Sequence, residues 1–264
     1  MDWRLIIDGD LPGQVNMARD SSILRSLESG SGRPTLRLYG WDRPTVSLGY
    51  LQDPAPFMGL GLPVVRRVTG GRAVVHWHEV TYSVAGLSDD ALFSGGITGA
   101  YSVISGCIAS ALRDAGVEAA LFKGKSGPGR SSACFRSPSR FEVLAGGRKL
   151  VGSAQRRFRR AFLQHGSILM SADFELNEKV FGPGLASAIA AVDEWSGTGA
   201  GDLKNLLVKR FSEGFRASFE ASGLSSAEER LAGELEGGLL LACPGAMSQM
   251  QGQAPDFTRK KNML

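Results

Sequence analysis

The sequence predicts an α+β fold in which a mixed or antiparallel β-sheet forms the core and helices flank it. Two observations support this fold class. Strand-like segments dominate the first part of the chain, and helical periodicity takes over after Asp202. A chain of 264 residues is short enough for one large domain. We therefore expect a single domain over residues 1–264, with a core at about 3–200 and a helical C-terminal extension at about 201–255.

The first half of the chain alternates strand-like and helix-like segments. A strand is expected at 3–9, followed by a helix at 13–29 whose apolar residues recur at helical spacing. The stretch "PTLRLYGWDRPTVSLGY" (34–50) predicts two strands joined by a turn that contains glycine. Residues 62–86 predict a strand, a Gly-Gly turn and a second strand, and residues 97–116 predict a helix.

The second half begins with a segment of loop composition. The stretch "FKGKSGPGRSS" (122–132) is rich in Gly, Ser and Lys and predicts a mobile loop. Residues 140–170 predict three strands, with one turn at Gly146-Gly147 and another around Arg159. The helical segments expected beyond Asp202 are 202–221 and 226–242.

Composition is that of an ordinary globular protein. Hydrophobic residues make up 43% of the chain and charged residues 21%. No apolar run approaches the roughly 18–20 residues that a membrane span needs, so no membrane association is expected. The N-terminal segment "MDWRLIIDGD" carries acids and lacks a basic stretch followed by an apolar one. A signal peptide is therefore not expected, and the predicted location is cytoplasmic.

Cysteines and histidines are few. The three cysteines are odd in number and far apart, which argues against a disulfide framework and a CxxC metal site. Cys107 lies on the apolar pattern of the helix at 97–116 and is expected in the core. His76 and His78 flank Trp77 and would share one face of a strand, but a two-histidine metal site needs further ligands. No bound metal is expected.

The net charge of +4 makes the protein mildly basic. Such a charge is compatible with nucleic acid or with an acidic protein partner. The basic stretch at 156–160 does not carry the series of interleaved aromatic residues expected of a single-strand binder. No nucleic-acid partner is therefore expected.

A glycine pair separates two strand-like segments in "RRVTGGRAVVH" (66–76). Glycines at such a place let the backbone approach a ligand and present its N–H groups. The side chains of Arg66, Arg67 and Arg72 could hold an anion there. A plain β-hairpin with exposed arginines accounts for the local pattern equally well, so this pattern alone leaves both readings open.

Cys134 lies in "SSACFRSPSRFE" (131–142), directly after the segment of loop composition. It does not belong to an apolar face, unlike Cys107. A loop cysteine near cations can have a lowered pKa and become nucleophilic. The alternative is a small half-buried residue at the start of a strand, and the local pattern on its own favours that alternative.

Lys149 stands between a glycine turn and the apolar pair Leu150-Val151, at the start of what reads as a buried strand. In a folded sheet it could meet Cys134. An ammonium group near a thiol stabilises the thiolate, and it can also stabilise an oxyanion that forms at an attacked carbonyl. His165 follows in the same segment, and a single histidine of this kind is more often structural than catalytic.

Four stretches together resemble the biotin/lipoate protein ligase superfamily in order and spacing: "SLGYLQ" (47–52), "RRVTGGRAVVHWHEVTYSV" (66–84), "ACFRSPSRFEV" (133–143) and "GRKLVGSAQRRFRRAFLQHGSIL" (147–169). Within it the chain is most similar to the cysteine-dependent octanoyltransferases of lipoate synthesis. Those enzymes carry "TGGRAVLH" where ATP-dependent lipoate ligases typically carry "TGGGAVYH", and Arg72 stands at the distinguishing place. The "GRNDL" stretch of the ligases has no counterpart here. Arg140-Phe141 is a small departure from these enzymes, which usually have an aromatic pair at this place.

The resemblance implies a role for each matching residue and a biotin/lipoate protein ligase-like catalytic domain. Cys134 stands where the family has its acyl acceptor. Lys149 stands where the family has a lysine that projects into an acyl-binding tunnel, which would explain its apolar neighbours. Backbone N–H groups at 70–73 and 152–154 would help to hold an oxyanion. The substrate-binding residues implied are Arg67, Thr69, Gly70, Gly71, Arg72, Ala73, His76, Gly152, Ser153, Ala154 and His165.

The implied reaction is octanoyl transfer through a cysteine thioester. The donor would be octanoyl-acyl carrier protein, and the acceptor a lysine of a lipoyl-accepting protein such as the glycine cleavage system H protein. The donor is already activated, so no cofactor is expected, neither ATP nor metal. Both partners would be acidic and would suit a basic enzyme. The alternatives are an octanoyl amidotransferase between lipoyl domains, an ATP-dependent lipoate-protein ligase and a non-catalytic binding module.

Overall fold

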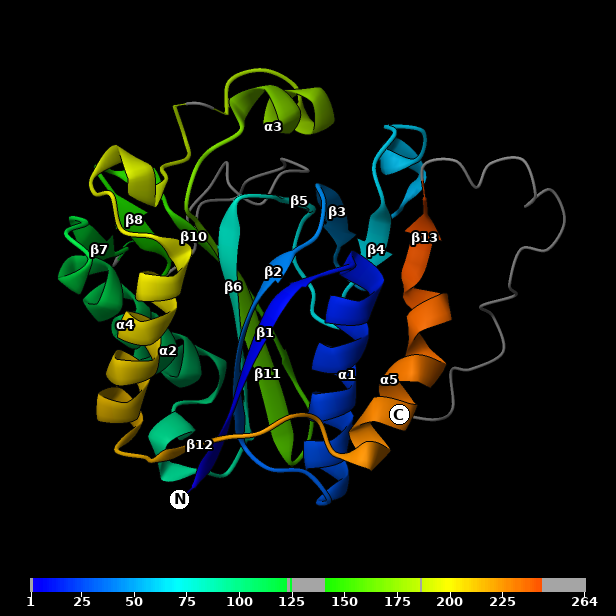
Figure 1. Cartoon of the computed structure of the whole chain (residues 1–264), viewed down its shortest axis with the longest axis vertical. Helices are drawn as coiled ribbons and strands as arrows, with labels where there is room; N and C mark the ends of the chain where they lie inside the picture. Colours follow the sequence, from blue (N-terminus) through cyan, green and yellow to red (C-terminus); the bar gives the residue numbers. More distant parts are fainter. Residues whose placement is uncertain (1, 123, 125–140, 186, 244–264) are drawn as a thin grey trace, which may run out of the picture.

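A six-stranded mixed sheet separates two layers of helices (Figure 1). The computed structural model describes residues 2–122, 124, 141–185 and 187–243. The strand order is β10 (Val151–Arg157), β11 (Ala161–Leu169), β6 (Glu79–Leu87), β2 (Thr35–Trp41), β1 (Trp3–Leu11) and β12 (Phe219–Ala221). β1 pairs in parallel with β2 and β12, and the other neighbours pair antiparallel. The α+β class with a mixed sheet is thereby confirmed.

Each layer contains two long helices. On one side of the sheet, α1 (Gly13–Ser29) lies beside α5 (Ser226–Leu239); on the other side, α2 (Gly96–Asp114) lies beside α4 (Ala200–Phe215) (Figure 1). α1 ends at Gly30, whose φ of +85° closes the helix in the left-handed conformation that glycine adopts without strain. The helices expected at 13–29 and 97–116 are confirmed.

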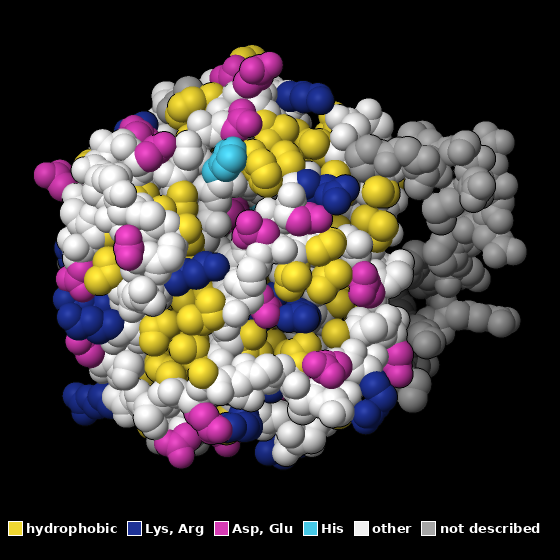
Figure 2. All heavy atoms as spheres, in the orientation of Figure 1, with side chains coloured by type: hydrophobic (Ala, Val, Ile, Leu, Met, Phe, Trp, Pro, Cys, Tyr) yellow, Lys and Arg dark blue, Asp and Glu magenta, His cyan; other side chains and the backbone are white. Residues whose placement is uncertain are grey.

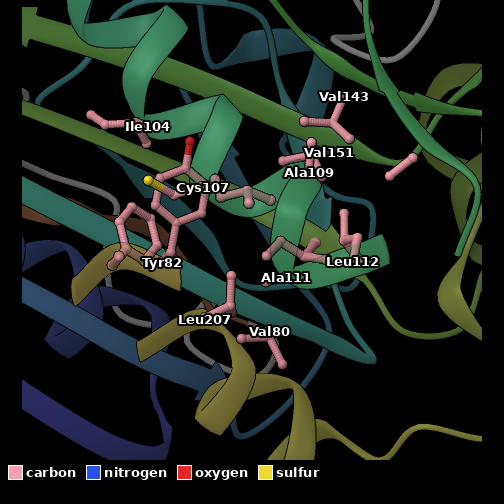
Figure 3. Packing of buried hydrophobic residues seen from close by; sticks show 14 of the residues in the cluster. Val80, Tyr82, Ile104, Cys107, Ala109, Ala111, Leu112, Val143, Val151 and Leu207 are labelled. Carbon is pink, nitrogen blue, oxygen red and sulfur yellow. The ribbon is translucent and has the colours of Figure 1, made fainter. Parts of the chain in front are cut away.

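The larger part of the core lies between the sheet and the α2–α4 layer (Figure 3). Cys107 is 6% exposed in this cluster, near Tyr82 of β6 and Leu207 of α4. Burial raises the pKa of its thiol to about 12. A Cβ atom added to Gly214 would lie 2.3 Å from the sulfur of Cys107, so α2 and α4 pack closely at this point. Cys107 is the core residue that the sequence predicted.

Two smaller sheets complete the described fold. One has the order β13 (Leu240–Ala242), β4 (Val64–Arg66), β3 (Thr45–Leu48) and β5 (Val74–His76). The other consists of β7 (Ala119–Leu121), β8 (Val143–Ala145) and β9 (Arg148–Lys149). Because β4 and β5 lie on opposite sides of β3, the Gly70-Gly71 pair does not close a β-hairpin. The hairpin reading of 66–76 is therefore wrong.

Several boundaries differ from the sequence prediction because tertiary contacts decide them. The strand expected after the glycine pair is split between β5 and β6 at His78, which has a φ of +48°. His76 is buried and His78 is exposed, so the two rings do not share a face as expected. The helix expected at 202–221 ends at Phe215, because Arg216 adopts the left-handed conformation, and 219–221 join the main sheet instead.

Shorter elements were not predicted. α3 (Phe174–Phe181) begins at Asp173, whose side chain accepts a hydrogen bond from the amide of Leu176. The helix expected at 226–242 ends at Leu239, and its last three residues form β13. Short 3-10 helices lie at Ala55–Phe57, Ala91–Phe93 and Val192–Glu194.

Acidic and basic side chains are interspersed over the face seen in Figure 2. Within the described ranges, no helix is long and apolar enough to cross a membrane. The same part of the chain contains no cluster of three or more His, Cys, Asp or Glu side chains able to hold a metal ion.

Candidate active site

An inner cavity with about 370 Å³ of empty space, part of it open to solvent, lies between α1, the main sheet and the β3–β5 sheet. Its apolar lining includes Met17 and Val74. Residues of β2, β3, β5, β6, β10 and β11, together with Arg67, supply the rest of the lining. Six of the predicted substrate-binding residues line it: Arg67, His76, Gly152, Ser153, Ala154 and His165.

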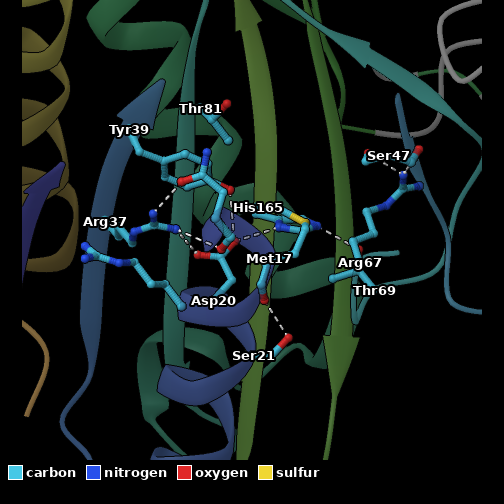
Figure 4. Close-up of polar contacts among 12 residues, drawn as sticks. Met17, Asp20, Ser21, Arg37, Tyr39, Ser47, Arg67, Thr69, Thr81 and His165 are labelled. Carbon is cyan, nitrogen blue, oxygen red and sulfur yellow. Dashed lines mark hydrogen bonds and ion pairs between the residues drawn. The ribbon is translucent and has the colours of Figure 1, made fainter. Parts of the chain in front are cut away.

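A buried carboxylate on α1 holds one side of this cavity (Figure 4). Asp20 accepts hydrogen bonds from Nδ1 of His165 at 2.9 Å, from Nη1 of Arg37 at 2.8 Å and from the hydroxyl of Tyr39 at 3.0 Å. Burial alone would raise the pKa of Asp20, but the bond from His165 and the charge of Arg37 hold it below its usual range. Asp20 is therefore ionised.

The protonation of His165 follows from these contacts. Burial lowers the pKa of His165 and outweighs the opposing effect of Asp20, so the ring is neutral. Because the carboxylate can only accept, the ring proton is on Nδ1. Nε2 is then the acceptor of the 2.7 Å bond with the hydroxyl of Thr69. Thr69, another predicted site residue, therefore acts by orienting the ring that lines the cavity.

A second histidine is fixed in the same way on the other side of the cavity. His76 bonds through Nδ1 to Glu79 at 2.9 Å and through Nε2 to the hydroxyl of Ser47 at 2.7 Å. Arg67 donates to the same hydroxyl oxygen at 2.9 Å, so Ser47 connects Arg67 to His76. The ring also stacks on Trp41, with 3.9 Å between ring centroids. The polar side chains around the cavity thus satisfy one another.

The loop around Gly70-Gly71 is braced by arginines rather than left open for an anion. Arg66 donates from Nη1 to the carbonyl oxygens of Gly49, Tyr50 and Gln52. Arg67 is buried and donates to the carbonyls of Gly70 and Arg72. Gly71 has a φ of +91°, and a Cβ atom on Gly49 would lie 2.2 Å from its carbonyl oxygen. Glycine at both positions is what allows this close approach.

An outer cavity of about 630 Å³, open to solvent, adjoins the inner one. Gly70, Gly71 and Arg72 form one wall, and Ile97 and Tyr101 of α2 form another. Ser153 and Ala154 of β10 line both cavities, so the two spaces meet at this strand. The predicted glycine loop and the predicted 152–154 segment are thereby brought together.

Lys149 is almost fully buried, at 2% exposure, beside the outer cavity. Its Nζ donates to Oε1 of Glu142 at 2.6 Å, and Glu142 itself lines the outer cavity. The backbone of Lys149 is fixed on both sides, because its N–H bonds to Ala188 and its carbonyl accepts from Ala190. This ion pair gives the ammonium a defined position next to the glycine loop and β10.

Two predicted site residues are not seen in this arrangement. Ala73 packs in an apolar cluster with Val46 and Val75, and it is not among the described residues that line either cavity. Cys134, together with most of the loop expected at 122–132, lies outside the described residues. The role of Cys134 stays a prediction.

Sequence reasoning missed Asp20, Glu79 and Glu142, the three carboxylates that hold the predicted cations and histidines. Asp20 carried a signal: it lies three residues after Met17 and four before Leu24, on the apolar face of its helix. A charge on a buried helix face needs a buried partner. Glu142 carried a similar signal, because it directly precedes the apolar pair Val143-Leu144 in a strand-like segment.

Comparison with known proteins gives a consistent family. The model of the lipoyl protein ligase A/B catalytic domain matches residues 12–212. A protein named octanoyltransferase LipM from Moorella thermoacetica is 45% identical over 179 residues, which is 64% of this chain and 65% of that protein, just under two thirds. One of the same name from Carboxydothermus hydrogenoformans is 36% identical over 253 residues, 88% of this chain and 94% of that protein.

Solved structures share the fold. A lipoate-protein ligase A bound with ATP has a TM-score of 0.75 at 28% identity and covers 90% of this chain and 95% of its own. A bipartite lipoate protein ligase from Thermoplasma acidophilum, described with its E2 lipoyl domain, has a TM-score of 0.72 at 25% identity and covers 90% and 92%.

Proposed function

The chain belongs to the lipoyl protein ligase A/B catalytic domain family, and from this membership we propose that it is an octanoyltransferase of lipoate synthesis. Its relatives at 45% and 36% identity carry that activity in their names. The geometry supports an acyltransferase, because two cavities share Ser153 and Ala154 in their linings and a buried ammonium lies beside the outer one. This shared lining at Ser153 and Ala154 is the observation that carries the proposal.

The inner cavity is the proposed site of the octanoyl chain. The surface that lines it is largely apolar, and Met17 and Val74 belong to it. His76, His165 and Arg67 line it, but their hydrogen-bonding groups already have partners. An acyl chain entering the cavity would therefore leave no polar group unsatisfied, so its burial carries little desolvation cost.

The proposed chemistry takes place at the outer cavity in two steps. The Cys134 thiolate attacks the carbonyl carbon of octanoyl-acyl carrier protein; a new C–S bond forms, the old one breaks, and the carrier leaves as a thiol after taking a proton. The neutral lysine amine of the acceptor then attacks the octanoyl-enzyme. The amide forms, Cys134 leaves as thiolate, and the amine releases its proton.

Lys149 is proposed to stabilise the anionic species of both steps. Its Nζ is held by Glu142, so it is oriented before the substrate arrives. A preorganised cation beside a developing oxyanion lowers the barrier more than a mobile one, because no reorganisation is needed during the reaction. Backbone N–H groups at 70–73 and 152–154 are proposed to contribute to the same stabilisation.

Intact mass spectrometry tests the proposal. Incubation with octanoyl-acyl carrier protein, without ATP, is expected to add one octanoyl group, and subsequent H protein is expected to remove it. Cys134→Ala should prevent the mass gain, whereas Cys107→Ala and Cys243→Ala should not. A Cys134→Ala protein that still becomes acylated would overturn the thioester mechanism.

The ATP-dependent ligase is the second candidate, because one structural neighbour is a lipoate-protein ligase bound with ATP. Pyrophosphate release from ATP and free octanoate separates the two reactions. No release is expected for the transferase, and sustained release would favour the ligase. An amidotransferase would be acylated by octanoyl-H protein in preference to octanoyl-acyl carrier protein. A cytoplasmic location stays a prediction.

A further inference from the structure

The rim of the outer cavity carries arginines without acidic partners. Among the described residues, Arg156 forms no ion pair, and its guanidinium carbon lies 4.3 Å from the ring centroid of Tyr50. The acidic side chain that lines this cavity, Glu142, is buried and bound to Lys149. The accessible charge at the rim is therefore positive.

Arg157 adds a second cation, from the other side of the same strand. Its Nε and Nη2 atoms are buried and have no hydrogen-bond partner. Its Nη1 lies 4.0 Å from the place that a Cβ atom on Gly96 would occupy. Gly96 directly precedes Ile97, which belongs to the cavity wall. Unpaired guanidinium groups cost free energy when desolvated, and burial lowers the pKa of this arginine. The Arg157 guanidinium lies over the ring of Phe162, 5.0 Å from its centroid, and no acidic side chain of the described residues pairs with it.

Exposed apolar side chains lie beside these cations. Tyr50 is 41% exposed and approaches Gly70, whose added Cβ would lie 3.8 Å from the ring. Leu51 is 81% exposed and Ile97 is 56% exposed. Aromatic and arginine residues together are enriched in protein–protein interfaces, whereas isolated exposed apolar residues are not informative. Ile97 lines the outer cavity, Tyr50 lies against Gly70 of its wall, and Leu51 follows Tyr50 in the chain.

We propose that this rim, defined by Tyr50, Leu51, Ile97, Arg156 and Arg157, is the docking surface for an acidic carrier protein that inserts its substrate arm into the outer cavity. This inference rests on the proposed octanoyl transfer. A single acceptor group at one opening must meet the acyl donor and the lysine acceptor in turn. Both proteins therefore use the same rim, and each must leave before the other binds.

The test compares a protein donor with a small one. Arg156→Glu reverses one rim charge, and Arg230→Glu makes the same change on α5 at an exposed residue that lines neither cavity. Acylation is followed by intact mass with octanoyl-acyl carrier protein and with the neutral thioester octanoyl-N-acetylcysteamine. Leu51→Ser provides an uncharged rim variant.

Arg156→Glu is expected to slow acylation by the carrier protein about tenfold or more at low salt, with a smaller effect at high salt. The small thioester should react within about twofold of the wild-type rate, and Arg230→Glu should match the wild type with both donors. Transfer from the octanoyl-enzyme to H protein should slow in parallel with the first step. Leu51→Ser should weaken carrier binding at all salt concentrations.

Three results would overturn the docking surface. An equal loss with both donors would mean that Arg156 shapes the cavity, and an unchanged rate with the carrier protein would mean that the rim is not used. Loss of the second step alone would assign the rim to the acceptor only. A wild-type enzyme that reacts with neither donor would instead overturn the proposed function, and the inference with it.

Discussion

The inner and outer cavities differ in how completely their polar groups are satisfied. Around the inner cavity, His165 and His76 are each held between a carboxylate and a hydroxyl, and Arg67 is saturated by carbonyls and Ser47. Near the outer cavity, beside Gly96, Arg157 keeps two buried nitrogens with no hydrogen-bond partner. The inner cavity therefore has a lining of fixed shape, whereas the outer cavity has cations nearby that can attract a charged group. Disturbing the first should cost stability, and disturbing the second should cost activity.

The largest expected effect is on the inner network. Asp20→Asn leaves the buried cation Arg37 with one carboxylate fewer, so unfolding should become easier by about 3–5 kcal/mol. Urea unfolding followed by circular dichroism measures this. The matched control is Arg33→Ala, which removes an exposed pair with Glu220 and should cost no more than about 1 kcal/mol. Equal losses in the two variants would contradict the distinction between a buried network and a surface pair.

Lys149→Ala is expected to lower the single-turnover transfer rate by about 10²–10³, the usual effect of removing one oxyanion-stabilising group. Lys149→Arg should also fail, because a planar guanidinium cannot occupy the place of a compact ammonium. Lys149→Ala removes the buried ammonium that pairs with Glu142, so a loss of folding must be separated from a loss of chemistry.

The double variant Lys149→Met/Glu142→Gln makes that separation, because replacing a whole buried ion pair is often close to neutral for stability. It should melt near the wild-type temperature and remain inactive. A double variant that folds and transfers octanoyl at a near wild-type rate would show that Lys149 has no catalytic role.

A smaller effect is expected on the pH dependence of stability. Burial holds the pKa of folded His165 below its ordinary value of 6.5, so below about pH 6.5 the unfolded state binds more protons than the folded state. The free energy of unfolding should therefore decrease as the pH is lowered from 7 to 5, by at most about 1.4 kcal/mol per pH unit. The lowered carboxylate pKa values, such as that of Glu228, act only below about pH 4.5.

Thermal melting from pH 5 to pH 7 tests this dependence. His165→Asn should flatten the profile, whereas the exposed His78→Asn should leave it unchanged. The same slope in wild type and His165→Asn would place the titrating group elsewhere.

The smallest effect concerns the thiols. Cys107 is buried with a pKa of about 12, so iodoacetamide at pH 8 should not label it in the native protein. Peptide mapping should find Cys107 labelled only after denaturation, while the proposed nucleophile Cys134 reacts in the native state. Native labelling of Cys107 at the rate of Cys243, which is partly exposed, would contradict the packing of α2 against α4.

Local periodicity was enough to predict the elements whose burial follows from their own sequence. The helices at 13–29 and 97–116 and the strands within 140–170 were predicted because their apolar spacing is regular over many residues. The short strands β12 and β13 were not, because each is three residues long and forms only against a partner far away in the chain. No local pattern contains that information.

The site was predicted in the same uneven way. The resemblance indicated Gly70-Gly71, Gly152–Ala154 and His165, and the fold brings these residues to two adjoining cavities. The partners that fix them, Asp20 and Glu142, could not be assigned. The local sequence around a carboxylate does not show which cation or histidine will lie beside it in the folded sheet.

The parallel pairing of β1 with β12 also bears on how the protein is made. β1 lies between β2 and β12, yet Trp3 pairs with Phe219, near the other end of the described chain. Arg4 likewise finds its buried partner Glu228 only after α5 has been synthesised. On the ribosome, one edge of β1 therefore has no strand partner, and Arg4 has no ion-pair partner, until residues 219–228 have been synthesised. Such an edge can pair with other nascent chains, so the protein is open to aggregation until this late pairing covers it.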